Sequence, residues 1–225
     1  MICVLISANS EWRAVKSYYS PIEKRNSPFG EFFNAEINRQ PLLFFQGGWG
    51  KVSAAASTQY VIDRWHPNML INLGTCGGLE GQITVGETVL ANSTVFYDVI
   101  ERMGDPDEAV RFYATQLDLA FIRKPYPQAV HVGGLASADQ DIDPTMVDIL
   151  RDKYQVAAAD WESGAIAWVA KRNETRCLIL RGVSDIVGAR GGEIYNDAAG
   201  QFHDRAGQIM TGLLGALPAW IEVIK

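Results

Sequence analysis

The sequence predicts an α/β fold with a mostly parallel β-sheet that is covered by helices on both faces. Short β-rich runs alternate with helical patterns along most of the chain, as in βαβ architectures. Several of the expected strands are apolar throughout, which is typical of strands buried on both faces. The 225 residues are 48% hydrophobic and 20% charged, enough for a core without disulfides. Without repeats or a linker in the sequence, we expect residues 1–225 to form a single domain.

The first half of the chain begins with "ICVLIS", an apolar run of strand length. Asn9 or Ser10 is suited to cap the helix that follows it. Further along, the polar residues 38–40 separate two β-rich runs and predict a hairpin. The expected elements are, in order, strand 2–7, helix 9–19, strands 31–37 and 41–48, helix 50–65, strand 68–75, and one long strand or two within 85–99.

The second half opens with residues 101–115, which look irregular. The run "AVHVGGLAS" then predicts another strand, and Pro144 is suited to the first turn of a helix. The run "RCLILRGVSD" is an apolar strand that ends in polar residues. The expected elements are strand 129–137, helix 144–154, a helix from about residue 161, strand 176–185, and a mostly helical tail over 194–224.

Charge and cysteine content exclude several classes of protein. The net charge is −6 and the sequence contains no basic stripe, so we expect no nucleic-acid partner. The cysteines Cys3, Cys76 and Cys177 are odd in number and widely spaced, as expected of reduced thiols in a cytoplasmic protein. The first apolar run is too short to span a membrane and lacks the layout of a signal peptide. The three histidines have no spacing typical of a metal site, so we expect no metal.

Four polar or glycine-rich segments follow expected strands: "SANSE", "GTCGG", "SADQD" and "SDIVG". In open α/β sheets, ligands bind beyond the carboxyl ends of the strands. The four segments therefore predict a binding site at one edge of the sheet. By contrast, "GGWGKVS" does not fit a phosphate-binding loop, because Val52 follows Gly50-Lys51 where that motif needs Ser or Thr.

Three carboxyl groups are candidates for this site. Glu11 follows the first strand, Asp185 follows the strand 176–185, and Glu162 lies at the head of a helix in "ADWESGAIAW". If they converge, burial and mutual repulsion raise at least one pKa, which suits proton transfer near neutral pH. The structural alternatives are a helix cap for Asp185 and solvated first-turn acids for Glu11 and Glu162.

The glycine-rich segment "NLGTCGGL" has two interpretations. Gly74, Gly77 and Gly78 leave backbone N–H groups open to a ligand's oxygen atoms, or they form a tight turn.

Four segments, taken in order, resemble the motifs of the nucleoside phosphorylase/nucleosidase superfamily, with the greatest likeness to the 5′-methylthioadenosine/S-adenosylhomocysteine nucleosidases. They are "GWGKVSAA", "NLGTCGGLEGQITVGETVLAN", "DWESGAIAWVA" and "LILRGVSD", and the likeness runs to about residue 188. The resemblance implies a three-layer α/β/α sandwich with a mixed, largely parallel sheet. It also implies cleavage of an N-glycosidic bond of a purine nucleoside without a metal or redox cofactor. A homo-oligomer is implied as well, with a dimer favoured and residues 93–100 at its contact.

The resemblance also assigns roles to individual residues. Asp185 resembles the acid that protonates the departing base, and Glu11 resembles the residue that positions and deprotonates the attacking water. Glu162 resembles the carboxylate that holds the ribose 2′- and 3′-hydroxyls. The remaining expected substrate-binding residues are Trp161, Thr75, Cys76 and Gly77 around the ribose and base, Ile142 at the purine edge, Ser184 beside the acid, and Arg181 near the water.

Two questions of chemistry remain open at this point. Phosphorylases of the superfamily carry an arginine just before the glycine-rich turn, where this chain reads "LINLGT", so water is favoured as the nucleophile. Arg13, Arg181 and Arg190 could still bind phosphate, and the alternatives are a phosphorylase or a catalytically idle nucleoside-binding protein. Trp161 replaces the family's methionine, and Asp141 stands where we expect an aromatic residue. Tyr195 and Phe202 are candidates to supply that aromatic wall.

Overall fold

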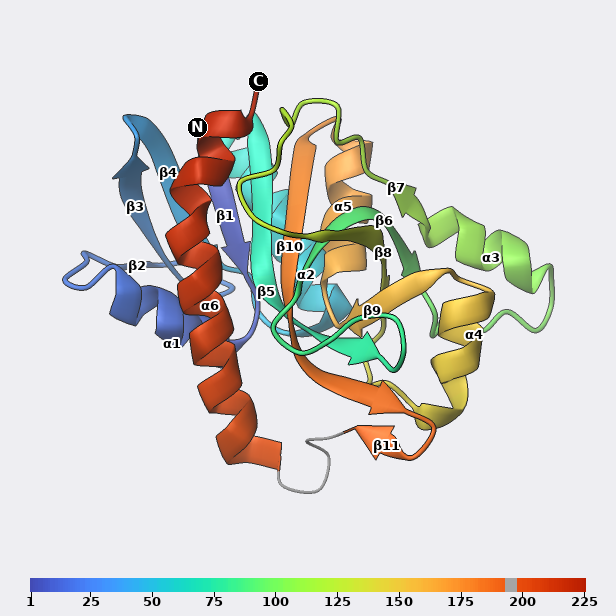
Figure 1. Ribbon diagram of the computed structural model, residues 1–225. Coiled ribbons are helices and arrows are strands. Elements are labelled where there is room, and N and C mark those ends of the chain that lie inside the picture. Colours follow the sequence, from blue (N-terminus) through green and yellow to red (C-terminus); the bar gives the residue numbers. More distant parts are fainter. Residues whose placement is uncertain (193–197) are drawn as a thin grey trace.

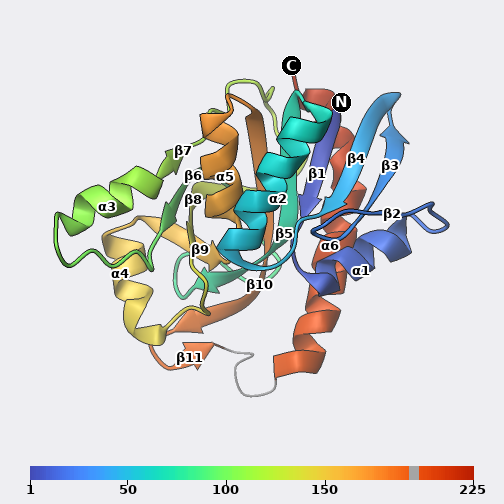
Figure 2. The same cartoon turned by 180° about the vertical axis from the view of Figure 1, so that it is seen from behind.

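One mixed β-sheet runs through the molecule and is covered by helices on both faces (Figure 1). The computed structural model describes the backbone of residues 1–192 and 198–225, and the side chains of residues 1–192 and 203–225. Helices α1 (Asn9–Tyr18) and α6 (Ala198–Val223) cover one face, while α2 (Gly50–Trp65) and α5 (Ser163–Arg172) cover the other (Figure 2). The predicted three-layer α/β/α architecture is confirmed.

The central strands of the sheet are parallel. β1 pairs in parallel with β4 on one side and with β5 on the other, and β5 continues in parallel with β10. Antiparallel pairs lie at the edges and at the junctions. The strands are β1 (Ile2–Ile6), β2 (Arg25–Asn26), β3 (Glu31–Ile37), β4 (Gln40–Gln46), β5 (Met69–Leu79), β6 (Thr88–Phe96), β7 (Thr115–Gln116), β8 (His131–Ser137), β9 (Val156–Asp160), β10 (Arg176–Gly188) and β11 (Gly191–Gly192).

Part of the sheet closes on itself. β5 pairs with β10, β10 with β6, β6 with β8, β8 with β9, and β9 again with β5. These strands form a barrel-like ring, whereas β1 to β4 continue as an open sheet. The sandwich therefore contains a barrel, and the far halves of β5 and β10 belong to it.

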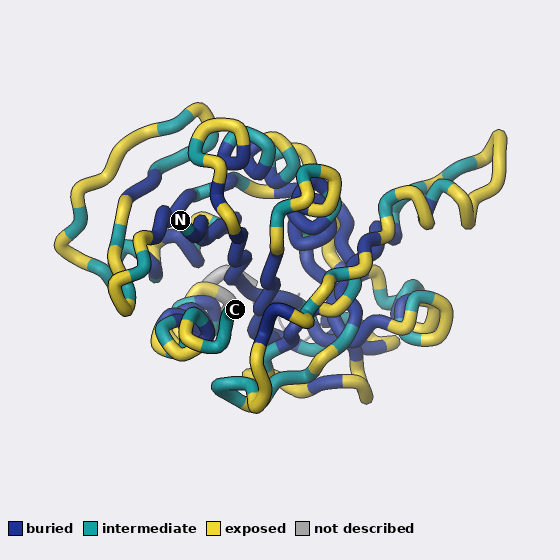
Figure 3. Tube along the Cα trace, turned by 90° about the horizontal axis from the view of Figure 1, so that it is seen from above, coloured by how far each residue is buried: buried dark blue, intermediate teal, exposed yellow. Residues whose placement is uncertain are grey.

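Apolar side chains fill both spaces between the sheet and the helices. Trp12 on α1 and Trp220 on α6 are almost fully buried against one face, and Ile166 on α5 is buried against the other. Fully burying a side chain of this kind contributes about 1.5–3 kcal/mol. Viewed from above, the buried trace is concentrated in the strands, while the segment around α3 (Pro106–Tyr113) projects outward and is largely exposed (Figure 3).

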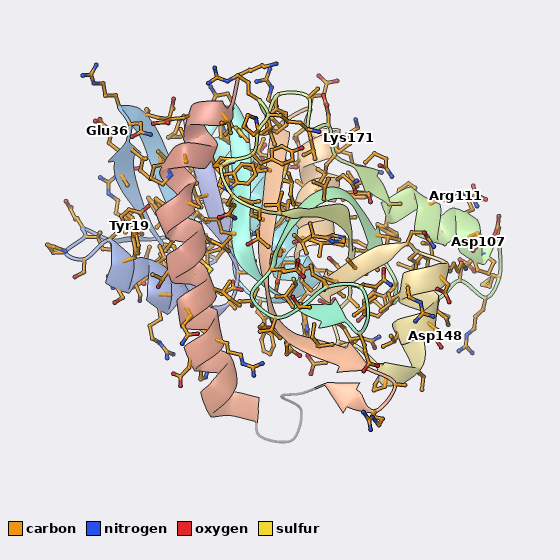
Figure 4. All side chains as sticks on the ribbon, in the orientation of Figure 1. Tyr19, Glu36, Asp107, Arg111, Asp148 and Lys171 are labelled. Carbon is orange, nitrogen blue, oxygen red and sulfur yellow. The ribbon has the colours of Figure 1, made fainter. Side chains whose placement is uncertain are left out.

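Many charged side chains lie on the outside of this core. Asp107 and Arg111 extend outward from α3, and Asp148 extends from α4 (Val147–Asp152), as Figure 4 shows. No helix in the described part of the chain is both long enough and apolar enough to cross a lipid bilayer.

Several expected elements are confirmed, and others need correction. The hairpin is present, with Asn38 and Arg39 at φ 52° and 63°, the left-handed conformation that a two-residue hairpin turn requires. Residues 101–115 were expected to be irregular and instead contain α3, whose N-cap Asp105 accepts the N–H of Asp107. Ala8, rather than Asn9 or Ser10, occupies the N-cap position of α1.

The largest corrections concern β5 and β10. Residues 74–78 were expected to form a loop or turn, but β5 continues through them to Leu79. β10 likewise runs past residue 185 to Gly188. The two extensions pair with each other, with a β-bulge at which Val183 faces Cys76 and Asp185 faces Gly77. Ser184 is the extra residue of this bulge, so Asp185 lies within a strand and is not a helix cap.

Candidate active site

A cavity of about 510 Å³ opens where the open sheet meets the ring of strands. Its wall contains residues from all four segments that the sequence predicted to meet. Three of its members are Glu11, Glu162 and Asp185, so the predicted convergence of carboxyl groups is confirmed. The described lining residues are Ala8, Asn9, Ser10, Glu11, Trp49, Thr75, Cys76, Gly77, Tyr97, Gln140, Asp141, Ile142, Ala159, Asp160, Trp161, Glu162, Ser184, Asp185, Val187 and His203.

Glu11 lies in the first turn of α1 and is only 1% exposed. Its Oε2 accepts the backbone N–H of Ala8 at 3.1 Å. Its Oε1 accepts the backbone N–H of Thr75 at 2.7 Å and the Thr75 hydroxyl at 2.9 Å. A carboxylate can accept about four hydrogen bonds, so these contacts fix its position and leave acceptor capacity on the cavity side.

Glu162 lies at the junction of β9 and α5 and is 4% exposed. Its Oε1 accepts the backbone N–H of Gly50 at 3.1 Å. Gly50 has φ +83°, and a Cβ there would lie 2.9 Å from an oxygen of Asp139, so this approach suits glycine.

The surroundings of Glu162 favour its neutral form. Burial, together with the negative charges of Asp160 and Glu11, raises the pKa of Glu162 to about 8, although Arg181 and the Gly50 N–H act in the opposite direction. The pKa of this carboxyl group therefore lies close to neutral pH.

Asp185 reaches the cavity because of the bulge in β10. Bulges re-aim side chains and are frequent beside functional sites. The hydroxyl oxygen of Ser184 lies 2.6 Å from Asp185 Oδ1 and 3.2 Å from the carbonyl oxygen of Cys76. Asp185 is 6% exposed and lines the cavity from a largely buried strand.

Arg181 lies behind the carboxyl groups and does not line the cavity. Its Nε lies 2.9 Å from Asp160 Oδ2, its Nη1 lies 3.8 Å from Glu11 Oε1, and its Nη2 lies 3.6 Å from Glu162 Oε2. Burial disfavours the charged guanidinium, but the surrounding carboxylates of Asp160, Glu11 and Glu162 raise the pKa of Arg181 above its usual value. One fixed cation thus contacts three carboxyl groups.

Gly74 makes room for this cluster. A Cβ at position 74 would lie 2.1 Å from Arg181 Nη1 and 2.8 Å from Glu11 Oε1. The guanidinium and the carboxylate can meet here only because residue 74 has no side chain.

Asp160 is a hub that the sequence analysis did not assign to the site. Its Oδ1 accepts the Ser137 hydroxyl at 2.6 Å and the backbone N–H groups of Glu162 at 3.2 Å and Ser163 at 3.1 Å. Its other oxygen pairs with Arg181. Asp160 therefore joins the first turn of α5 to β8 and β10, and its proximity to Glu162 in "DWE" was the only signal in the sequence.

The remaining wall is largely apolar. Cys76 and Ile142 line it, and Gly77 leaves room for Ile142, whose Cδ1 would lie 3.0 Å from a Cβ at position 77. Burial raises the pKa of the Cys76 thiol well above its usual value, so Cys76 packs as an apolar residue rather than acting as a nucleophile. Trp161 stacks on Trp49, which the sequence analysis had not singled out.

Positive charge is scarce at this cavity. Among the described residues that line it, none is Lys or Arg. Arg13 and Arg190 are exposed elsewhere, and Arg181 is engaged by carboxylates. The part of the chain with described side chains also contains no cluster of His, Cys, Asp and Glu suited to a metal ion. Tyr195 and Phe202, the candidates for an aromatic wall, lie outside the residues whose side chains are described.

Comparison with known proteins agrees with this geometry. The family model of the phosphorylase superfamily matches residues 2–217. The chain belongs to the phosphorylase superfamily. A relative in Geobacillus sp. (strain WCH70), the 5′-methylthioadenosine/S-adenosylhomocysteine nucleosidase, is 31% identical over 170 residues, which cover 70% of this chain and 73% of the relative.

Solved structures of two hydrolases of nucleosides share the fold of this chain. The Campylobacter jejuni 5′-methylthioadenosine/S-adenosylhomocysteine nucleosidase superposes with a TM-score of 0.77 at 18% identity, covering 97% of this chain and 98% of that one. The futalosine hydrolase of Helicobacter pylori superposes with a TM-score of 0.79 at 16% identity, covering 96% of each chain. At these identities, the likeness shows a shared fold.

Proposed function

We propose that the protein hydrolyses the N-glycosidic bond of a 5′-substituted adenine nucleoside, such as 5′-methylthioadenosine or S-adenosylhomocysteine, and releases adenine. The observation that carries this proposal is the meeting of Glu11, Glu162 and Asp185 in one cavity. The nucleosidase relatives support the substrate class. The absence of Lys and Arg from the described lining favours water over phosphate as the nucleophile, because a phosphate dianion needs cationic partners.

Asp185 acts as the general acid. An adenine anion is a poor leaving group, and a proton delivered to the base at N7 turns it into a neutral one. Ser184, whose hydroxyl lies 2.6 Å from Asp185 Oδ1, orients the carboxyl group. General acid catalysis of this kind contributes about 10²–10⁴-fold to the rate.

The other two carboxyl groups act on the sugar. As the base departs, positive charge develops on the ribose, and fixed negative charges in a buried site stabilise it. Glu162 accepts hydrogen bonds from the 2′- and 3′-hydroxyls, a pairing that suits the two oxygens of a carboxylate. Glu11 orients the attacking water and takes its proton, with Arg181 behind it.

The rest of the wall binds the base and ribose. Thr75, Cys76 and Gly77 line the ribose and base, and Trp161 lies against the sugar. The backbone of Ile142 reads the purine edge.

We further propose that the protein works in the cytoplasm, in methionine salvage, and that it forms a homodimer with residues 93–100 at the dimer contact. Three free, buried cysteines fit a reducing compartment. The exposed apolar side chains Ile100 and Met103, which are 74% and 99% exposed, fit a surface covered by a second copy. Sedimentation at micromolar concentration tests the dimer, and a monomer throughout would contradict it.

Chromatography of the products tests the reaction. Purified protein is incubated with 5′-methylthioadenosine, S-adenosylhomocysteine, deoxyadenosine and inosine, with and without phosphate. We expect free adenine and a free sugar in the absence of phosphate. Turnover that requires phosphate would make the protein a phosphorylase, and binding without turnover would make it an idle binding protein.

The variant Asp185→Asn tests the role of the acid. We expect turnover to fall by about 10²-fold or more, because the amide cannot deliver the proton. Circular dichroism and the urea midpoint check that the fold is retained. Unchanged turnover in a folded variant would remove Asp185 from the mechanism.

A further inference from the structure

Two tryptophans form a stacked pair at the rim of the cavity. Trp49 precedes α2 and Trp161 precedes α5, and their ring centroids lie 4.9 Å apart with an interplanar angle of 26°. Both residues line the cavity, yet Trp49 is 67% exposed. A single exposed aromatic residue is common on protein surfaces. An indole that is stacked at the rim of a cavity, with most of its surface free, offers a face on which a ring of a ligand can stack.

The backbone beside Trp49 is firmly anchored. The N–H of Gly50 donates to Glu162 at 3.1 Å, and the N–H of Lys51 donates to Asp139 at 2.7 Å. The Lys51 ammonium group also pairs with Asp98. The backbone beside Trp49 is therefore fixed relative to Glu162, and the indole itself is held by its stack on Trp161, so little ordering of the protein opposes binding on it.

The position of the pair points to one part of the substrate. This step rests on the proposed function, in which Glu162 holds the ribose hydroxyls and Asp185 serves the base. Gly50, adjacent to Trp49, contacts Glu162 directly, so the pair lies on the sugar side of the cavity. Trp49 is also open to solvent. A group that leaves the sugar toward solvent, the 5′-substituent, therefore passes over the indoles.

We infer that Trp49 and Trp161 form a subsite for the 5′-substituent, and that this subsite selects a flat aromatic group. An aromatic ring can stack on the free indole face, whereas a methylthio group covers only part of it. Stacking of a ring on a protein aromatic side chain corresponds to about tenfold in affinity. The ratio of kcat/KM between an aryl and a small 5′-substituent therefore depends on Trp49.

Steady-state kinetics test this subsite with three adenine nucleosides: 5′-phenylthio-5′-deoxyadenosine, 5′-cyclohexylthio-5′-deoxyadenosine and 5′-deoxyadenosine. In the unmodified protein we expect kcat/KM to be highest for the phenylthio compound, which is flat, and lower for the cyclohexylthio compound, which is bulky but not flat. In Trp49→Ala, the ratio of phenylthio to 5′-deoxyadenosine should fall about tenfold. Trp49→Phe should retain most of that ratio, because it keeps a ring.

Val52→Ala is the matched control, since Val52 is 80% exposed near the start of the same helix and does not line the cavity. It should keep the ratio of the unmodified protein. An equal loss of kcat/KM on all three substrates in Trp49→Ala, with or without a change in sedimenting mass, would overturn the subsite. So would an unchanged ratio.

The same compounds separate this inference from the proposed function. If the unmodified protein releases no adenine from any of them, the proposed function fails. Calorimetric titration of the same nucleosides then still tests the subsite, which requires tighter binding of the phenylthio compound by the unmodified protein than by Trp49→Ala. Equal binding by the two proteins would overturn it.

Discussion

Replacing Asp160 by Asn removes one negative charge from the buried cluster and keeps the size of the side chain. Asp160 Oδ2 lies 2.9 Å from Arg181 Nε, and losing one partner of a buried ion pair costs about 3–5 kcal/mol. Arg181 keeps Glu162 at 3.6 Å and Glu11 at 3.8 Å. We therefore expect the low end of that range, a loss of about 3 kcal/mol in the free energy of unfolding, measured by urea denaturation.

The same substitution should move the pH profile of the enzyme. The charge of Asp160 helps to raise the pKa of Glu162 to about 8, so its removal lowers that pKa. If ionised Glu162 binds the ribose hydroxyls, kcat/KM rises as the pH rises through this pKa. In Asp160→Asn the rise should begin about one pH unit lower. The rate of adenine release at limiting substrate, measured from pH 5 to 9, gives kcat/KM as a function of pH and tests this shift.

Asp141→Asn is the control for this experiment, because Asp141 is an exposed acid on the same cavity and has no ion pair with Arg181 among the described contacts. In Asp141→Asn, kcat/KM should rise over the same pH range as in the unmodified protein. If the rise of kcat/KM in Asp160→Asn stays at the same pH, or moves to higher pH, Asp160 does not set the ionisation of Glu162.

Three further outcomes follow from the same contacts. The pKa of Glu162 is raised to about 8, so the folded state holds this proton more tightly than the unfolded state does. The free energy of unfolding, measured by urea denaturation, should therefore fall between pH 5 and 8 by an amount of order 4 kcal/mol. In Glu162→Gln this fall should be smaller. Gly74→Ala would place a methyl carbon 2.1 Å from Arg181 Nη1, and we expect at least about 100-fold lower kcat/KM by adenine release. Ser184→Ala removes the hydroxyl 2.6 Å from Asp185 and should lower kcat about tenfold, with an unchanged circular dichroism spectrum; an undiminished kcat would exclude an orienting role.

Much of the fold could be predicted from local sequence patterns. The boundaries of α2 and the β3–β4 hairpin follow from helical periodicity and from turn residues that tolerate left-handed backbone, both of which are properties of neighbouring residues. The convergence of Glu11, Glu162 and Asp185 followed from a rule about strand ends together with the family resemblance.

The features that the sequence did not reveal depend on contacts between distant segments. β9 reads "VAAAD", with a single β-branched residue, and it is a strand because β5 and β8 supply its partners. The closed ring depends on that pairing. Asp160 becomes a hub only when Arg181 and Ser137 reach it from other strands. Trp49 stacks on Trp161, which precedes a different helix, so its place in the wall of the cavity could not be predicted from its neighbours in the sequence.

The bulge in β10 makes the site sensitive to residue count as well as residue type. Side chains alternate between the two faces of a strand, so deleting Ser184 would restore the regular pleat and turn Asp185 toward the opposite face. A shortened chain could thus keep every carboxyl group and still lose the proposed proton donor. The direction in which Asp185 points thus depends on the number of residues that precede it in β10 as well as on its own identity.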